Sequence, residues 1–151
     1  MRTLLILVVL LLVAVIGAAL WFRNVSMPAE VWHVDPGAVT PPAVQNFELR
    51  VGEAAPVFDV APDVLAARID AIATAERADM IGGALALGEM TYVARSRIMG
   101  FPDAISIRLV PVGAGTRMEV FSRARFGQSD LGVNAARVAR WVAAARGQAG
   151  S

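Results

Sequence analysis

The sequence predicts an α+β domain, an antiparallel four-stranded meander packed against two helices, preceded by one transmembrane helix. Three patterns lead to this prediction: an apolar run at the N-terminus, two stretches of helical periodicity, and a group of alternating stretches between them. The alternating stretches are separated by short turns. Strands joined in this way pair antiparallel, whereas parallel strands need long crossover connections.

The N-terminal run Leu4–Phe22 contains 19 residues without a charged side chain. As a helix it covers about 28 Å, close to the roughly 30 Å hydrocarbon core of a bilayer. A cleaved signal peptide is the alternative, but its apolar stretch is shorter and ends in small residues. Here Trp21 and Phe22 end the run and suit a membrane interface. Residues 1–23 are therefore predicted to be an uncleaved signal anchor, with residues 4–22 in contact with lipid.

The charges that flank the run indicate its orientation. Arg2 and the α-amino group precede it, and Arg23 follows it. The larger positive charge favours the cytoplasmic side for the N-terminus. We therefore expect a single-pass protein of the inner (cytoplasmic) membrane with a periplasmic C-terminal domain.

After the anchor, residues 24–44 read as a Pro-rich linker, because four prolines disfavour regular helix there. Residues 45–151 are predicted to form one domain outside the cytoplasm, opening with a short strand at Gln45–Val51. The first helix of the domain is expected to begin near Pro62 and to bury a stripe of apolar side chains, made of Leu65, Ile69 and Ile72.

The meander is predicted from alternating polar and apolar residues, with a turn at Gly100–Asp103. Its four strands are expected at Met80–Leu87, Met90–Ile98, Ile105–Val110 and Thr116–Arg125. A second helix is predicted from Leu131 to Arg146. Its buried stripe is expected to contain Leu131, Ala135, Val138, Val142 and Trp141, with Arg137 and Arg140 on the other side.

Charge is distributed unevenly along the chain. Residues 24–90 carry three Arg and ten acidic residues, whereas residues 91–151 carry nine Arg and three acidic residues, and the chain has no Lys. Two interpretations stay open. The halves neutralise each other through internal salt bridges, or an Arg-rich face binds an anionic partner.

Several kinds of chemistry lack the residues they need. The chain has no Cys, and His33 is its only histidine. Zinc sites, thiol nucleophiles and Ser–His–Asp triads are therefore not expected. No glycine-rich phosphate motif occurs, and the aromatic residues are not interleaved with arginines as nucleic-acid binding requires. We predict no cofactor, no metal and no nucleic-acid partner.

The candidate ligand-binding residues lie on the predicted strands and at the start of the last helix. Arg95 is expected roughly opposite Arg108, and alternation places Arg123 and Arg125 on one face. Four guanidiniums would then gather near a helix N-terminus, which favours anions. The full candidate set is Arg95, Arg108, Arg123, Arg125, Asp103, Ser129, Asp130 and Asn134.

Two segments resemble a known family. Gly100–Leu109 (GFPDAISIRL) and Ser122–Arg137 (SRARFGQSDLGVNAAR) are similar to the hallmark blocks of the domain-of-unknown-function family fourteen ninety-nine. The second block fits SRxRxGxSDxGxNxxR at every fixed position. The resemblance covers most of the chain after the anchor. It implies a domain that is often membrane-anchored, and it implies no particular reaction.

Three functions are compatible with these observations. The first is a membrane-anchored binding or accessory module of the cell envelope, whose Arg-rich face recognises an anionic small molecule, a lipid headgroup or an envelope protein partner. The second is a hydrolase in which Asp103 and Asp130 do acid–base work and Arg123 and Arg125 hold an anionic substrate. The third is a structural subunit of a membrane complex, with the anchor helix as its main interface.

Overall fold

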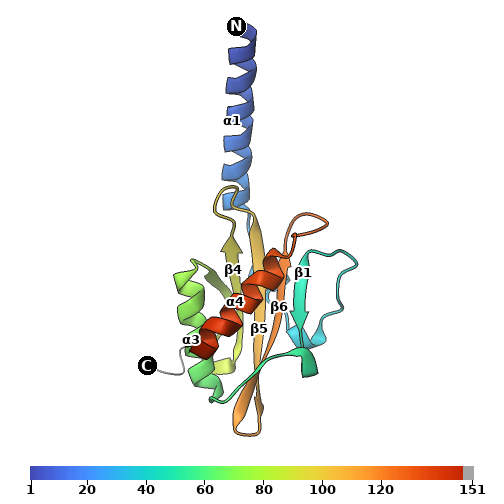
Figure 1. Ribbon diagram of the computed structural model, residues 1–151, viewed down its shortest axis with the longest axis vertical. Coiled ribbons are helices and arrows are strands. Elements are labelled where there is room, and N and C mark those ends of the chain that lie inside the picture. Colours follow the sequence, from blue (N-terminus) through green and yellow to red (C-terminus); the bar gives the residue numbers. More distant parts are fainter. Residues whose placement is uncertain (148–151) are drawn as a thin grey trace.

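The computed structural model describes residues 1–147 and confirms the α+β class with an N-terminal apolar helix (Figure 1). Its helices and strands, in chain order, are α1 (Arg2–Asn24), α2 (Ala29–Trp32), η1 (Pro36–Ala38), β1 (Phe47–Arg50), η2 (Gly52–Ala54), β2 (Val57–Phe58), α3 (Pro62–Ala75), β3 (Asp79–Ala84), η3 (Leu85–Leu87), β4 (Glu89–Arg95), β5 (Pro102–Val112), β6 (Gly115–Ala124) and α4 (Val133–Gly147).

The sheet contains the predicted meander and is larger than expected. Strands β3 to β6 pair antiparallel in chain order, as their alternation and short turns predict. Two further strands, β1 and β2, both pair with β6, so the sheet has six strands where a four-stranded meander was predicted. Strand β1 is the short strand expected at Gln45–Val51, and β2 was not predicted. Sequence patterns do not specify this long-range pairing, because β1 and β6 are separated by some seventy residues.

One face of the sheet is covered by α3 and α4 (Figure 1). The main core lies between these two helices and the sheet. The predicted stripe of α3 is confirmed, since Leu65, Ile69 and Ile72 are all buried. The stripe of α4 differs from the prediction. Leu131 precedes the helix and is 94% exposed, and Arg137, expected on the outer side, is buried.

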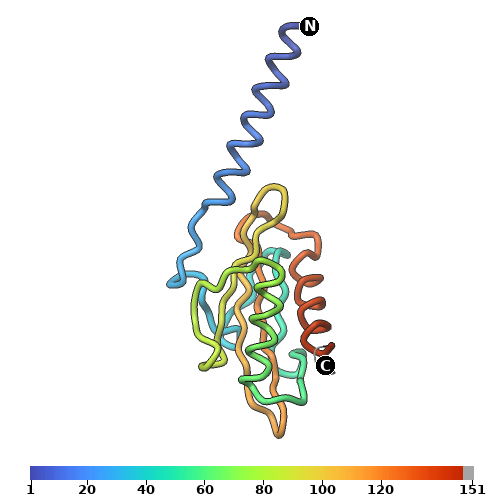
Figure 2. Tube along the Cα trace, turned by 90° about the vertical axis from the view of Figure 1, so that its left-hand side faces the viewer, coloured from blue at the N-terminus to red at the C-terminus, as the bar shows by residue number. Residues whose placement is uncertain are grey.

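The opposite face of the sheet is covered by residues 25–39, which we call the strap (Figure 2). Met27 is buried there and packs with Trp32, Ile81, Val93 and Ala104 in a second, smaller core. The molecule therefore has three layers: helices, sheet and strap. The predicted division into anchor, linker and domain stays a prediction, and the structure adds that much of the Pro-rich stretch lies against the sheet.

Helix α1 projects away from these layers and buries none of its residues (Figure 1). It is long and apolar enough to cross a membrane, with a mean hydropathy of 3.2. Its last turn contacts the domain. The ring of Phe22 packs on those of Phe101 and Phe126, and the Arg23 guanidinium donates hydrogen bonds to the carbonyls of Arg97 and Ile98.

Candidate anion-binding site

The four predicted arginines do not gather at one point. Arg95 pairs in register with Pro102, and Arg108 pairs with Glu89, so these two arginines lie at opposite ends of the β4–β5 ladder. The expectation that they face each other is wrong. The turn lies earlier than predicted, and Pro102 already belongs to β5, which shifts the register of the hairpin. All four arginines do contact the strap.

Two of these arginines bind the backbone where α1 leads into the strap. Arg95 donates hydrogen bonds to the carbonyls of Phe22 (2.7 Å) and Val25 (2.9 Å). Arg125 donates to the carbonyl of Ser26. Partial burial lowers the pKa of Arg95, and the positive charge of Arg125 adds to this effect. The backbone that leaves α1 is thus fixed to the sheet by two cations.

Arg123 is the most buried of the four, at 8% exposure. Its guanidinium donates to the carbonyl of Trp32 (2.7 Å) and to Ser106 Oγ (3.3 Å), and it stacks against Trp32 and Phe121. Burial lowers its pKa to about 10. Among residues 1–147 no carboxylate lies within ion-pair distance of it. Internal salt bridging, one of the two interpretations of the uneven charge, therefore does not apply to Arg123.

Arg108 is the neutralised member of the set. It forms ion pairs with Asp35 of the strap (2.6 Å) and with Glu119 of β6 (2.9 Å). Internal salt bridging therefore does apply to Arg108. Two carboxylates and one guanidinium leave no positive charge here for an external anion.

Asp103 lies on the helix side of the sheet and pairs with Arg137, which sequence reasoning placed on the outer side of α4. Asp103 Oδ2 and Arg137 Nη2 are 2.7 Å apart, and both residues are buried. Burial raises the pKa of the Asp103 carboxyl, and the Arg137 charge lowers it only in part. Arg137 also donates to Asn134 Oδ1 (2.8 Å). The Asp103 carboxylate is therefore buried in an ion pair with Arg137.

Asp130 and Ser129, both candidate ligand-binding residues, organise the start of α4. Asp130 accepts hydrogen bonds from the backbone of Gly132 (3.0 Å) and Asn134 (2.9 Å) and from the Asn134 side chain (2.7 Å). Ser129 Oγ accepts from the Leu131 amide. Partial burial opposes ionisation of Asp130, but the hydrogen bonds from Asn134 and Gly132 outweigh it and lower the pKa. These residues form a helix cap.

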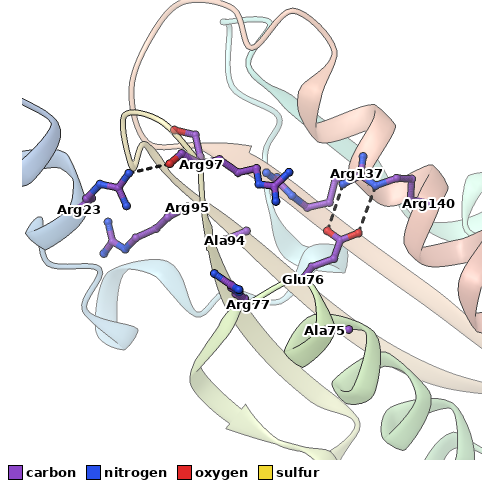
Figure 3. A pocket seen from close by; sticks show the side chains of 10 residues that line it. Arg23, Ala75, Glu76, Arg77, Ala94, Arg95, Arg97, Arg137 and Arg140 are labelled. Carbon is purple, nitrogen blue, oxygen red and sulfur yellow. Dashed lines mark hydrogen bonds and ion pairs between the residues drawn. The ribbon is translucent and has the colours of Figure 1, made fainter.

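The structure contains a cavity that the candidate set largely missed. It has a volume of about 750 Å³ and lies where the end of α3, the end of β4 and the first half of α4 meet the last turn of α1 (Figure 3). Arg95 is the one predicted site residue among those that line it. The lining residues are Arg23, Ala75, Glu76, Arg77, Ala94, Arg95, Ser96, Arg97, Arg137 and Arg140.

Six of the ten lining residues are arginines, and Glu76 is the one acidic residue among them. Arg140 binds Glu76 at 3.2 Å, as Figure 3 shows. Arg77 and Arg97 have no ion-pair partner within residues 1–147. The cavity is therefore rich in positive charge. Arg23 and Arg95 likewise bind carbonyls and no carboxylate among residues 1–147, so four of the six guanidiniums are not neutralised by an ion pair.

Arg77 also has an unusual backbone. It follows the end of α3 with φ of 57°, a left-handed conformation that normally favours glycine. The amides of Arg77 and Ala78 close the helix by donating to the carbonyls of Thr74 and Ala73. The left-handed backbone is less favourable for arginine than for glycine. With arginine at this position, a guanidinium lies at the cavity.

The sequence contains only a faint signal for this cavity. Arg95 and Arg97 alternate at the end of a predicted strand, and Arg23 follows the apolar run. Nothing local connects them with Arg77 or Arg140, because the end of α3 and the outer side of α4 meet this edge only in the folded molecule. Asp103, Asp130, Ser129 and Asn134, by contrast, do not line the cavity.

Fold and site together define a class: a small α+β domain, held by an apolar N-terminal helix, with an arginine-lined cavity beside that helix. A family model matches residues 33–144, described as a protein of unknown function (DUF1499), so the chain belongs to the DUF1499 family. The suspected resemblance is thereby confirmed. Neither a curated protein nor a solved structure matches the chain.

Proposed function

We propose that this protein is a membrane-anchored binding module of the cell envelope, and that its arginine-lined cavity binds an anionic ligand. The observation that supports this proposal is the concentration of six arginines and one glutamate around one cavity. Guanidinium groups bind phosphate and carboxylate oxygens through paired, charge-assisted hydrogen bonds. The ligand class is therefore a molecule that carries phosphate or carboxylate groups.

Retention of the anchor is part of the proposal. The last turn of α1 contributes to the folded domain through Phe22 and Arg23, and Arg95 binds the carbonyl of Phe22. Cleavage after the apolar run would remove these contacts. They support an uncleaved anchor in the inner membrane. The charges around the run support a periplasmic domain.

A hydrolase is less well supported than a binding module. Asp103 is paired with Arg137, and Asp130 caps α4. Neither carboxylate lines the cavity that would hold an anionic substrate. A structural role for α1 in a membrane complex stays a prediction, and none of its residues is buried by the domain.

The test uses the full-length protein in detergent micelles, with pyrophosphate as the probe and chloride at matched ionic strength as the reference. A ligand that binds only the folded state raises stability by RT ln(1 + [L]/Kd), about 2.7 kcal/mol at 100 times Kd. We expect pyrophosphate to raise the melting temperature. The double variant Arg77→Gln/Arg97→Gln should lose this increase while retaining its melting temperature in chloride, because neither arginine has an ion-pair partner among residues 1–147.

The matched control is Arg68→Gln/Arg117→Gln, which removes the same charge from residues outside the cavity. It should respond to pyrophosphate as the unmodified protein does. Equal stabilisation of all three proteins would indicate a nonspecific charge effect and would contradict the proposal. An unmodified protein that does not respond would contradict it as well.

A further inference from the structure

We propose that the end of the domain beside α1 lies in the membrane interface, where the loop residues Ile98, Phe101 and Leu131 contact the bilayer that holds the anchor. This surface goes beyond the anion-binding cavity and does not depend on it. It would make the domain a body whose end beside α1 rests on the membrane, in place of one suspended on a flexible tether.

The position of two loops supports this proposal. The connections between β4 and β5 (residues 96–101) and between β6 and α4 (residues 125–132) both lie at the end of the sheet nearest α1 (Figures 1 and 2). Phe101 packs on Phe22 with 4.3 Å between ring centroids, and Phe126 packs on both Trp21 and Phe22. Both loops therefore touch the last turn of the anchor.

The length of the anchor determines the depth of these loops. The run Leu4–Phe22 spans about 28 Å as a helix, close to the roughly 30 Å of a hydrocarbon core. Its last residues, Trp21 and Phe22, consequently lie at the boundary between hydrocarbon and headgroups. Side chains that pack directly on these rings lie at the same level.

The loop tips carry apolar side chains that are exposed and are not packed in the core of the domain. Ile98 is 83% exposed, Leu131 is 94% exposed, and Phe101 is 39% exposed. Leu131 has φ of 53°, where glycine or asparagine would fit with less strain. Within residues 1–147 nothing packs on Leu131 to offset that strain. Contact with lipid would explain both the residue type and its exposure.

The charge beside these tips agrees with an interfacial position. Arg97 precedes Ile98, and Arg23 is bound to the carbonyls of both residues. Arginines at a bilayer surface keep their guanidiniums among the headgroup phosphates while their stems lie along apolar groups. Apolar tips next to arginines are the composition expected of a surface that dips into the interface.

The experiment measures the depth of single positions. The chain has no Cys, so one cysteine can be introduced at a time and spin-labelled. Ile98→Cys and Leu131→Cys are compared with Leu87→Cys in the full-length protein, reconstituted in nanodiscs of phosphatidylethanolamine and phosphatidylglycerol. Leu87 is the matched control, because it is 73% exposed and lies at the other end of the sheet, just before β4 begins.

Collision rates with oxygen, which concentrates in the bilayer, and with a water-soluble nickel chelate report the depth of each label. We expect the oxygen-to-nickel ratio at positions 98 and 131 to be several-fold higher than at position 87. Equal ratios at all three positions would overturn the proposal. Low collision rates with both reagents at positions 98 and 131 would mean that a second copy of the chain covers the loops, and would overturn it too. None of these outcomes depends on whether the cavity binds pyrophosphate.

Discussion

The guanidinium of Arg123 stacks on the indole ring of Trp32, with 5.2 Å between Arg123 Cζ and the ring centroid, and also donates a 2.7 Å hydrogen bond to the Trp32 carbonyl. One residue thus holds both the side chain and the backbone of the strap. Because no carboxylate pairs with Arg123 within residues 1–147, its charge is stabilised by aromatic faces and carbonyl dipoles.

The first prediction concerns this contact. Arg123→Gln should lower the free energy of unfolding by about 1–3 kcal/mol, because a desolvated cation–π contact is worth about 2 kcal/mol and each net hydrogen bond about 1 kcal/mol. Urea unfolding of the full-length protein in micelles measures the loss. The double variant Arg123→Gln/Asp130→Asn should show additive losses, within about 0.5 kcal/mol, because the two side chains share no contact. Recovery of stability in the double variant would contradict the observed pairing.

The second prediction concerns the buried pair of Asp103 and Arg137. Arg137→Gln should cost about 3–5 kcal/mol, because it leaves a buried carboxylate without its partner. Replacing both residues, as in Asp103→Leu/Arg137→Met, should recover most of that loss. The control is Arg140→Gln, which breaks the partly exposed pair with Glu76 and should cost about 0–1 kcal/mol. Equal losses for Arg137→Gln and Arg140→Gln would show that burial of the Asp103–Arg137 pair does not increase the cost of breaking it, and would contradict the prediction.

The third prediction concerns pH. The folded-state pKa of Asp130 lies below its ordinary value of 3.8, so the carboxylate stabilises the fold above that pH. This contribution is lost as the pH falls from near 3.8 through the lower folded-state pKa. Asp130→Asn should therefore flatten the acid side of the stability profile, measured by urea midpoints from neutral pH downwards. An unchanged acid slope would mean that Asp130 is not held as a carboxylate by the cap.

The fourth prediction concerns the mature N-terminus. We expect the membrane-bound protein to retain residues 1–23 and to stay with membranes after a carbonate wash, because the apolar run is long and ends in the bulky residues Trp21 and Phe22. Intact-mass measurement of the purified protein gives the result. An N-terminus found near Asn24 would show that the run is a cleaved signal peptide.

The fifth prediction concerns topology. A phosphatase fused after Ser151 should be active, because this reporter works only outside the cytoplasm and the charges before the run outnumber those after it. A fluorescent protein that folds only in the cytoplasm, fused at the same position, serves as the converse reporter. Fluorescence together with an inactive phosphatase would reverse the orientation.

Much of the fold could be predicted from local sequence. The run Leu4–Phe22, the stripe of α3 and the alternation of β4, β5 and β6 each follow from the spacing of apolar residues along one element. The cap formed by Ser129 and Asp130 is also local, since its partners lie within four residues. These features depend on neighbours in the chain, and sequence periodicity reports such neighbours directly.

Only the tertiary structure decided what each arginine contacts. Alternation placed Arg123 and Arg125 on one face of a strand, but it could not reveal that the strap covers that face and binds both of them. The register of the β4–β5 hairpin depends on where its turn begins, and a turn at residues 96–101 separated Arg95 from Arg108. The arginine-lined cavity combines α1, α3, β4 and α4, which lie far apart in the chain. Sequence by itself determined which elements form, because their periodicity is local. The fold decided which charges meet, because those contacts join distant residues.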